Sequence, residues 1–208
     1  MFINRSEAAH ALLGPLTHHA DDPDAMILAI PRGGLVLGDV LSRELHLPLE
    51  VMLTKKIGYP GHPEFAIGAV SVTSMVVEES YRKSHSDYID ESVISIRQQL
   101  EARHASYMGG LAPLSFQGRR VIITDDGVAT GHTIMSAISL VRQEAAAKIV
   151  VAVPVGAPDT IERLRHLADE VMCLSVPESF HAVGQFYREF EQVSDSEAIR
   201  LFRRGEGA

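Results

Sequence analysis

The sequence predicts an α/β fold, a domain doubly wound around a mostly parallel sheet, because short β-branched runs alternate with helical patterns along the chain. Mainly apolar runs occur at 26–30, 121–124 and 149–153, and a uniformly apolar strand is expected where helices cover both faces of a sheet. The 208 residues are enough for one sizeable core. Because no repeat and no obvious linker divides the chain, we expect residues 1–208 to form a single domain.

Capping signals mark the beginnings of two helices near the ends of the chain. Asn4 followed by Glu7 has the spacing of a capping box, in which each residue satisfies a backbone N–H at the helix start. Ser194 and Glu197 repeat this spacing. The first helix is therefore expected over 5–17, and another near the C-terminal end. Further helices are expected at 35–45, 132–144 and 159–167.

A long amphipathic segment interrupts the alternation of strands and helices. Its apolar positions predict one helix over 87–107, which Gly109-Gly110 and Pro113 should end. We expect it to form a helical insertion of about residues 84–110. The remaining strands are expected at 51–53, 68–72, 75–78 and 171–176, with the middle two as a hairpin that turns at Thr73-Ser74.

The charge balance and the cysteine count limit the partners and the compartment. The formal net charge is −8, which disfavours a general nucleic-acid binder because such a protein needs a basic footprint. No apolar run approaches the roughly 18 residues that span a bilayer, and the start of the chain lacks the segments of a signal peptide. The single cysteine, Cys173, fits a reducing compartment. We therefore expect a cytoplasmic protein that binds neither nucleic acid nor membrane.

The segment 121–133 has the properties of a ribose-phosphate site. Asp125 and Asp126 directly follow a predicted strand, and open α/β sheets bind ligands at the carboxyl ends of their strands. The loop 129–133 then opens a helix, whose first backbone N–H groups can hold an anion. Acids for sugar hydroxyls and amides for a phosphate together describe a ribose 5-phosphate. From spacing alone, an ordinary strand–turn–helix junction capped by an aspartate is an equal alternative.

Two further strand ends carry basic residues. Pro31-Arg32-Gly33-Gly34 follows the first strand, and paired glycines beside an arginine suit a backbone nest for a second anion. Lys55-Lys56 follows the second strand, where at most one of two adjacent side chains can easily face a pocket. An ordinary turn and two solvated surface lysines are the alternatives. The loop 58–64, rich in glycine and proline, comes next.

Metal-binding patterns in the sequence are weak. His62-Pro63-Glu64 is similar to the His-x-Glu of zinc deaminases, but their Pro-Cys-x-x-Cys is absent. His18 and His19 are adjacent at a presumed helix end. Because neighbours in a helix do not share a face, we predict two surface residues and no metal site there.

The segment 121–133 resembles the signature of type I phosphoribosyltransferases, enzymes that use 5-phosphoribosyl diphosphate. It departs from that signature at Thr124, Gly127 and His132. The form Asp-Asp-Gly-Val-Ala-Thr-Gly is similar to one bacterial branch, whose members are known as predicted phosphoribosyltransferases. The resemblance covers nearly the whole chain. Further segments that carry it are 30–34, 56–70 and 180–187.

The resemblance implies a type I phosphoribosyltransferase fold with a small C-terminal hood at about 177–190. It also implies transfer of a phosphoribosyl group to a nitrogenous base or amine, with release of pyrophosphate. Mg²⁺ is the implied cofactor, held through the substrate or by water bridges to the acid pair, and dimers are common in the family. Catalytic roles then fall on Asp125, Asp126, Lys56 and Glu64. Substrate-binding roles fall on Arg32, Gly33, Gly34, Gly127, Ala129, Thr130, Gly131, His132 and Thr133.

The acceptor of the phosphoribosyl group has no motif in the sequence, so purines, pyrimidines and other amines are all compatible with it. Phe180 or Tyr187 in the hood could stack on a planar base, or pack as ordinary hydrophobic residues. Two other functions stay open. One is a non-catalytic sensor of 5-phosphoribosyl diphosphate, and the other is a hydrolase that acts on a ribosyl phosphate.

Overall fold

The main sheet confirms the predicted α/β fold. This computed structural model describes residues 1–109 and 112–205, apart from the side chains of Glu64 and Arg204. Its main sheet has five parallel strands in the order β2-β1-β6-β7-β8. The strands are β1 (Ala25–Ala29), β2 (Leu49–Val51), β6 (Arg120–Thr124), β7 (Lys148–Val155) and β8 (Glu170–Ser175). The second strand begins earlier than predicted, because pairing with β1 starts at Leu49.

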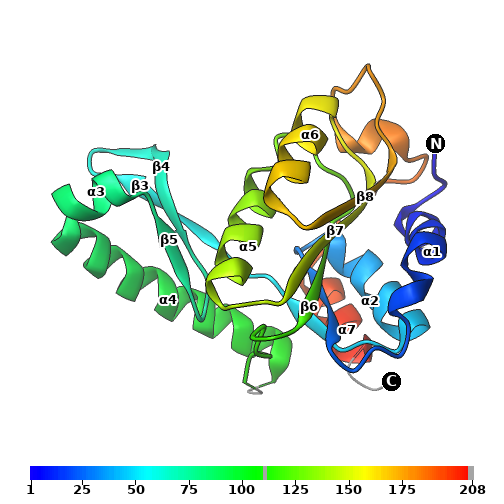
Figure 1. Ribbon diagram of the computed structural model, residues 1–208, viewed down its shortest axis with the longest axis horizontal. Helices are drawn as coiled ribbons and strands as arrows, with labels where there is room; N and C mark the ends of the chain where they lie inside the picture. The colour runs from blue at the N-terminus through cyan, green and yellow to red at the C-terminus, as the bar shows by residue number, and fades with distance from the viewer. Residues whose placement is uncertain (110–111, 206–208) are drawn as a thin grey trace.

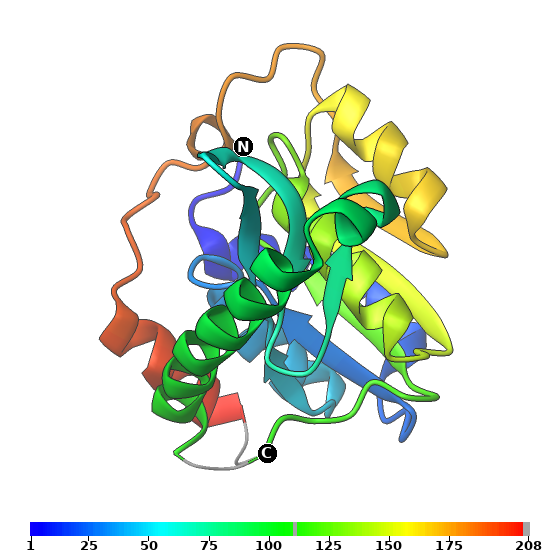
Figure 2. The ribbon, with the colours of Figure 1, turned by 90° about the vertical axis from the view of Figure 1, so that its left-hand side faces the viewer.

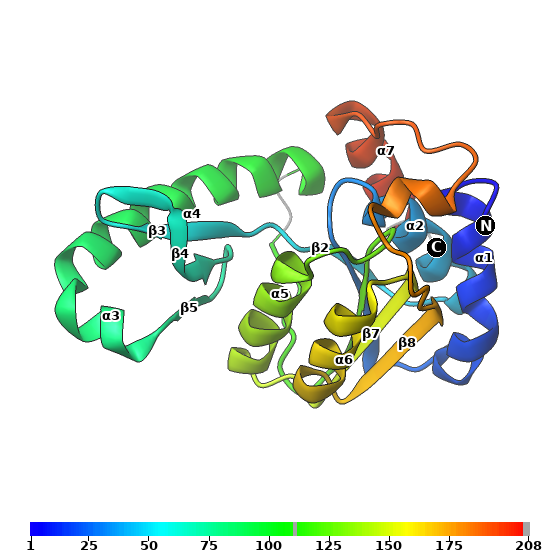
Figure 3. The ribbon, with the colours of Figure 1, turned by 90° about the horizontal axis from the view of Figure 1, so that it is seen from above.

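Helices cover both faces of this sheet (Figure 1 and Figure 3). One face carries α5 (His132–Gln143) and α6 (Pro158–Leu167), and the other carries α1 (Arg5–Leu16) and α2 (Gly34–Leu45), with α7 (Asp195–Gly205) packed on α2. Successive residues of β1 therefore enter different cores. Ile27 packs with the α1 and α2 side, whereas Met26 and Leu28 pack with the α5 and α6 side. Cover on both faces explains why the strands are uniformly apolar.

A second, antiparallel sheet in the order β3-β4-β5 projects from the body (Figure 1 and Figure 3). Helix α4 packs against it (Figure 2). We call this projection the arm. Its elements are β3 (Lys55–Tyr59), β4 (His62–Val70), β5 (Met75–Val77), α3 (Glu79–Ser84) and α4 (Ser86–Met108). The predicted long helix is confirmed as α4. It ends at Gly109, which has a left-handed φ of 61°, whereas Gly110 lies outside the described residues.

The segment 58–64 corrects the prediction of a loop. It forms the hairpin between β3 and β4, in which Tyr59 pairs with His62, and Lys56 lies within β3 rather than after a strand. The register of the hairpin shifts on either side of Gly58. A Cβ added at Gly58 would lie 2.6 Å from the Pro63 backbone. Gly58 therefore marks a close backbone approach within a pair of strands, and it does not indicate a loop.

The prediction of two surface histidines is wrong for His19, whose side chain is only 2% exposed. Both histidines lie in the short 3₁₀ helix η1 (Thr17–His19), which follows α1. His18 is exposed. The two adjacent side chains do point in different directions, as expected, but that of His19 points into the protein interior.

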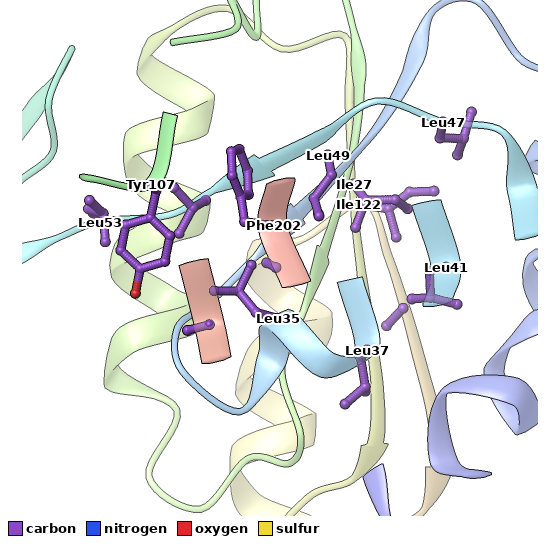
Figure 4. Close-up of a cluster of buried hydrophobic side chains, with 14 of the residues drawn as sticks. Ile27, Leu35, Leu37, Leu41, Leu47, Leu49, Leu53, Tyr107, Ile122 and Phe202 are labelled. Atoms are coloured by element: carbon purple, nitrogen blue, oxygen red, sulfur yellow. The ribbon is translucent and has the colours of Figure 1, made fainter. Parts of the chain in front are cut away.

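One hydrophobic core runs from the main sheet into the arm (Figure 4). Ile27 and Leu35 belong to the body, whereas Tyr107 belongs to α4, and Phe202 of α7 packs between them. The Tyr107 and Phe202 rings meet edge to face, with centroids 6.2 Å apart. At 23 residues α4 is the longest described helix, but neither it nor another described helix has the apolar character of a membrane span.

Candidate functional site

The acid pair lies at the carboxyl end of β6, the central strand of the main sheet. The side chains of Asp125 and Asp126 are both partly buried. Asp125 Oδ1 accepts a hydrogen bond from the backbone N–H of Asp126 at 2.8 Å. Burial and the adjacent Asp126 carboxylate raise the pKa of Asp125 well above its usual value. Two carboxylates so placed favour a cation or hydroxyl donors beside them.

Asp126 has a partner that the sequence did not indicate. Arg5, at the start of α1, donates from Nε to Asp126 Oδ2 at 2.7 Å, and from Nη1 to the Glu191 carbonyl oxygen at 2.7 Å. The guanidinium also lies over the Phe190 ring, 3.8 Å from its centroid. The Arg5 and Asp126 side chains are only 11% and 14% exposed. Since 121 positions separate the two residues, no local spacing could reveal the pair.

The loop between β1 and α2 packs directly against the acid pair. A Cβ added at Gly33 would lie 2.0 Å from Asp126 Oδ2, and one at Gly34 would lie 2.8 Å from the Thr124 carbonyl oxygen. Only glycine permits this approach at either position. The Pro31-Arg32 peptide bond in this loop is cis.

A cavity of about 330 Å³ lies where this loop meets the acid pair. Arg5, Arg32, Gly33 and Asp126 line it. The Arg32 side chain is partly exposed, with Nη1 3.8 Å from Asp195 Oδ1 on α7. The structure therefore brings Asp126 together with the loop 31–34, the predicted nest for a second anion, although they come from different parts of the chain.

The loop 129–133 leads into the first turn of α5, as the sequence predicted. Gly131 is the N-cap with a left-handed φ of 73°, and His132 and Thr133 are exposed in the first turn. The first N–H groups of a helix have no acceptor within the helix. Thr160 of α6 donates its hydroxyl hydrogen to the Ala129 carbonyl oxygen at 2.7 Å, which anchors the loop.

Two larger cavities flank this helix start. Lys56 lines one of about 880 Å³ together with His132 and Thr133, between the arm and α5. His132 also borders the other, of about 660 Å³, whose lining includes Thr130 and Phe180. His132 therefore borders both cavities at the beginning of α5, whereas Lys56 lines only the one beside the arm.

Two further predicted residues are Glu64 and Gly127. Glu64 lies on β4, but its side chain is not among those described. Gly127 faces the segment that follows β8, residues 177–191, which we call the tail, because a Cβ added there would lie 2.6 Å from Val183 Cγ1.

Tyr187 is a second residue whose role the sequence did not reveal. It is 6% exposed, and its hydroxyl donates to the Asp126 carbonyl oxygen at 2.6 Å. Its ring packs between Phe2 and Phe190, with centroids 5.6 and 5.1 Å away. Burial raises the pKa of Tyr187, which keeps the hydroxyl protonated as a donor. Tyr187 therefore holds the tail against the acid pair and is not available to stack on a base.

An acid pair, a glycine loop and a helix start at the carboxyl ends of parallel strands define a class of α/β proteins that bind phosphorylated ligands. The family of the phosphoribosyl transferase domain matches residues 9–191, so the chain belongs to that family. The predicted relationship to type I phosphoribosyltransferases is confirmed.

Individual relatives agree with this assignment. Two provisionally named phosphoribosyl transferases of Mycobacterium tuberculosis, from strains CDC 1551 and H37Rv, are each 34% identical over 208 residues. These matches cover 98% of this chain and 47% of each relative, so the chain spans about half their length. The crystal structure of TT1426 from Thermus thermophilus is similar with a TM-score of 0.85, at 37% identity and with 97% of both chains covered.

Proposed function

We propose that the protein transfers a phosphoribosyl group from 5-phosphoribosyl diphosphate to a nitrogenous base or amine and releases pyrophosphate. The observation that carries the proposal is the contact of Gly33 with Asp126, which puts the glycine loop beside the acid pair. The start of α5 offers donors for a second anion nearby. A sugar with a phosphate at one end and a pyrophosphate at the other matches this arrangement.

The acid pair is assigned to the ribose. Asp125 and Asp126 accept hydrogen bonds from the sugar hydroxyls, while the N–H groups of 129–133 hold the 5-phosphate. Arg32 and the amides of Gly33-Gly34 hold the pyrophosphate. With both anions fixed, the acceptor nitrogen attacks C1 of the ribose as the bond from C1 to the pyrophosphate oxygen breaks. The pyrophosphate takes the electron pair of the broken bond, and the acceptor nitrogen releases its proton to solvent. Catalysis therefore consists mainly of positioning and charge stabilisation.

The arm is assigned to the acceptor side. Lys56 lines the cavity between the arm and α5 and adds positive charge beside the site. Glu64, on the next strand of the arm, is assigned to ordering the hairpin or contacting the acceptor. Closure of the hairpin 58–64 over the sugar would exclude water, which otherwise competes with the acceptor for C1.

The acid pair also suits Mg²⁺. Carboxylate oxygens are ligands that this ion prefers, directly or through its waters. A cation would offset the burial and the adjacent Asp126 charge, which together raise the pKa of Asp125. Mg²⁺ bound with the substrate would neutralise charge on the pyrophosphate. Asp125 and Asp126 are the residues that would hold it.

Arg5 is assigned a positioning role. Its hydrogen bond fixes the Asp126 carboxylate and balances the negative charge before substrate binds. Asp126 Oδ2 is already engaged, so the sugar must share or displace the guanidinium.

The first test is the affinity for 5-phosphoribosyl diphosphate, measured by calorimetry with and without Mg²⁺. Asp126→Asn keeps the shape of the side chain and removes its charge. A charge-assisted hydrogen bond is worth about 1.5–3 kcal/mol, or roughly a ten- to hundredfold loss of affinity. Circular dichroism of the variant controls for folding. Unchanged affinity in a folded Asp126→Asn protein would overturn the assignment of this residue.

The second test separates the functions. Pyrophosphate release is measured with 5-phosphoribosyl diphosphate, Mg²⁺ and a panel of purines, pyrimidines and small amines. Release that requires one acceptor supports the transferase. Release without any acceptor identifies a hydrolase, and tight binding without release for every acceptor identifies a sensor.

A further inference from the structure

A cluster of two histidines and a glutamate lies away from the acid pair. His18 and His19 form the end of η1, and Glu170 is the first residue of the edge strand β8. Asp125 follows the carboxyl end of β6, which runs parallel to β8 in the same sheet. The cluster therefore lies at the amino ends of the parallel strands, opposite the acid pair, and takes no part in the proposed transfer.

His19 is the unusual member of this cluster. Its side chain is 2% exposed, yet neither Nδ1 nor Nε2 has a hydrogen-bond partner among the described residues. Buried polar atoms in native proteins nearly always have a partner, because burial without one is unfavourable. A group that ligates the imidazole would satisfy it.

The neighbours of His19 supply further ligand atoms. One nitrogen of His18, one nitrogen of His19 and one carboxylate oxygen of Glu170 all lie within 4.8 Å of one another. The two imidazole rings are adjacent, with centroids 3.9 Å apart. His18 is exposed and Glu170 is partly exposed, so both side chains can adjust around the buried His19.

We propose that His18, His19 and Glu170 bind one Zn²⁺ ion, with water as the fourth ligand. Two imidazoles and a carboxylate form a donor set that zinc favours, at distances of about 2.0–2.2 Å. Reaching those distances requires the three atoms to approach one another, and the two accessible side chains provide that movement. The ion would join the end of the first helical segment to the edge strand β8.

Lys148 gives the proposal a specific test. Its Nζ lies 2.6 Å from Glu170 Oε2, so it competes with a metal ion for the carboxylate and adds positive charge. Lys148→Gln removes that charge. Zn²⁺ should therefore bind this variant more tightly than the wild type, a result that a purely structural ion pair would not produce.

The experiment uses the full chain without a histidine tag, freed of metal with a chelator. Zn²⁺ is titrated by calorimetry, and the melting temperature is measured with and without the ion. We expect one Zn²⁺ per chain, a rise in melting temperature, and a Kd at least about tenfold weaker in His18→Ala. Co²⁺ in place of Zn²⁺ should give the visible absorption of a tetrahedral site.

A matched control is available on α6. His166 and Glu162 form an exposed histidine–glutamate pair, with Nε2 3.6 Å from Oε1, and His166→Ala removes it. This variant should bind Zn²⁺ as the wild type does. Because His18 is exposed, His18→Ala should fold normally. No Zn²⁺ binding by the wild type, equal losses in His18→Ala and His166→Ala, or weaker binding by Lys148→Gln would overturn the proposal.

Discussion

Arg5 and Asp126 join a helix near the N-terminus to the loop after β6. The same guanidinium contacts the tail through the Glu191 carbonyl oxygen and the Phe190 ring. Tyr187 adds a hydrogen bond from the tail to the Asp126 backbone. These contacts fix the carboxylate assigned to the ribose before any ligand binds. The Asp126 carboxylate is therefore held in place by residues that are assigned no part in the transfer reaction itself.

Removing Arg5 should cost stability as well as disturb the site. Arg5→Ala leaves the partly buried Asp126 carboxylate without its charged partner, and we expect a loss of about 1.5–3 kcal/mol in the free energy of unfolding. Urea denaturation followed by circular dichroism measures it. Arg165→Ala is the control, because Arg165 and Glu162 form an exposed pair worth less than about 1 kcal/mol. Equal effects of the two substitutions would contradict the special position of Arg5.

Asp125 should make stability depend on pH in an identifiable direction. Its pKa is raised in the folded protein, so the unfolded chain loses this proton first as pH rises. Native stability contributed by the protonated group is complete below the ordinary carboxyl value of about 4 and is lost as pH passes through the raised value. Asp125→Asn should therefore raise the melting temperature at pH 8, and raise it less at pH 5. An increase that is the same at both pH values would contradict this assignment.

At the scale of elements, the glycine loop between β1 and α2 positions the acid pair. Gly33→Ala would put a methyl group 2.0 Å from Asp126 Oδ2, so the carboxylate or the loop must move. We expect a loss of about 1–3 kcal/mol of stability and a weaker affinity for 5-phosphoribosyl diphosphate.

Gly14→Ala in α1 is the matched control, because nothing lies within 4 Å of the added Cβ. Because Pro15 follows and crowds a Cβ at position 14, the gain from replacing a helical glycine is offset, and we expect a change in stability of less than about 1 kcal/mol. Similar effects at both glycines would show that the loop tolerates the methyl group.

Elements with strong local signals were predictable from the sequence. Uniform apolar runs gave the central strands, and the spacing of Ser194 and Glu197 gave α7, where Ser194 Oγ accepts from the Glu197 N–H at 3.2 Å. Strand β3 was hidden, because Lys55-Lys56 and Gly58 are typical of exposed turns. It is a strand because antiparallel pairing with β4 and packing on α4 outweigh those local preferences.

The candidate site was predictable only where its parts are contiguous. The acid pair and the loop 129–133 lie in one segment, and the loop 31–34 has its own pattern of glycine and arginine. Arg5 and Tyr187 carry no such pattern, since each meets the acid pair through the tertiary fold alone. His19 was misplaced for the same reason, because helical spacing says which residues share a face and not which face is covered.

At the scale of the whole molecule, the arm and the body share one core. Phe202 of α7 is fully buried and meets Tyr107 of the arm, in a cluster that also contains Ile27 of the main sheet and Ile57 of β3. The arm is therefore packed onto the body by apolar contacts. We expect the two to unfold together, even though their sheets are separate.

Phe202→Ala should test this coupling. Loss of a buried phenylalanine costs about 3–5 kcal/mol, whereas Ile94→Ala on the exposed face of α4 should change stability by less than about 0.5 kcal/mol. The chain has no tryptophan, and its tyrosines are Tyr59, Tyr81, Tyr88, Tyr107 and Tyr187, all but the last in the arm. Tyrosine fluorescence thus follows mainly the arm, and circular dichroism follows the helices of both parts. The two signals should melt at one temperature in the wild type and shift down together in Phe202→Ala. Fluorescence that melts well before the circular dichroism would instead show that the arm unfolds as a separate unit.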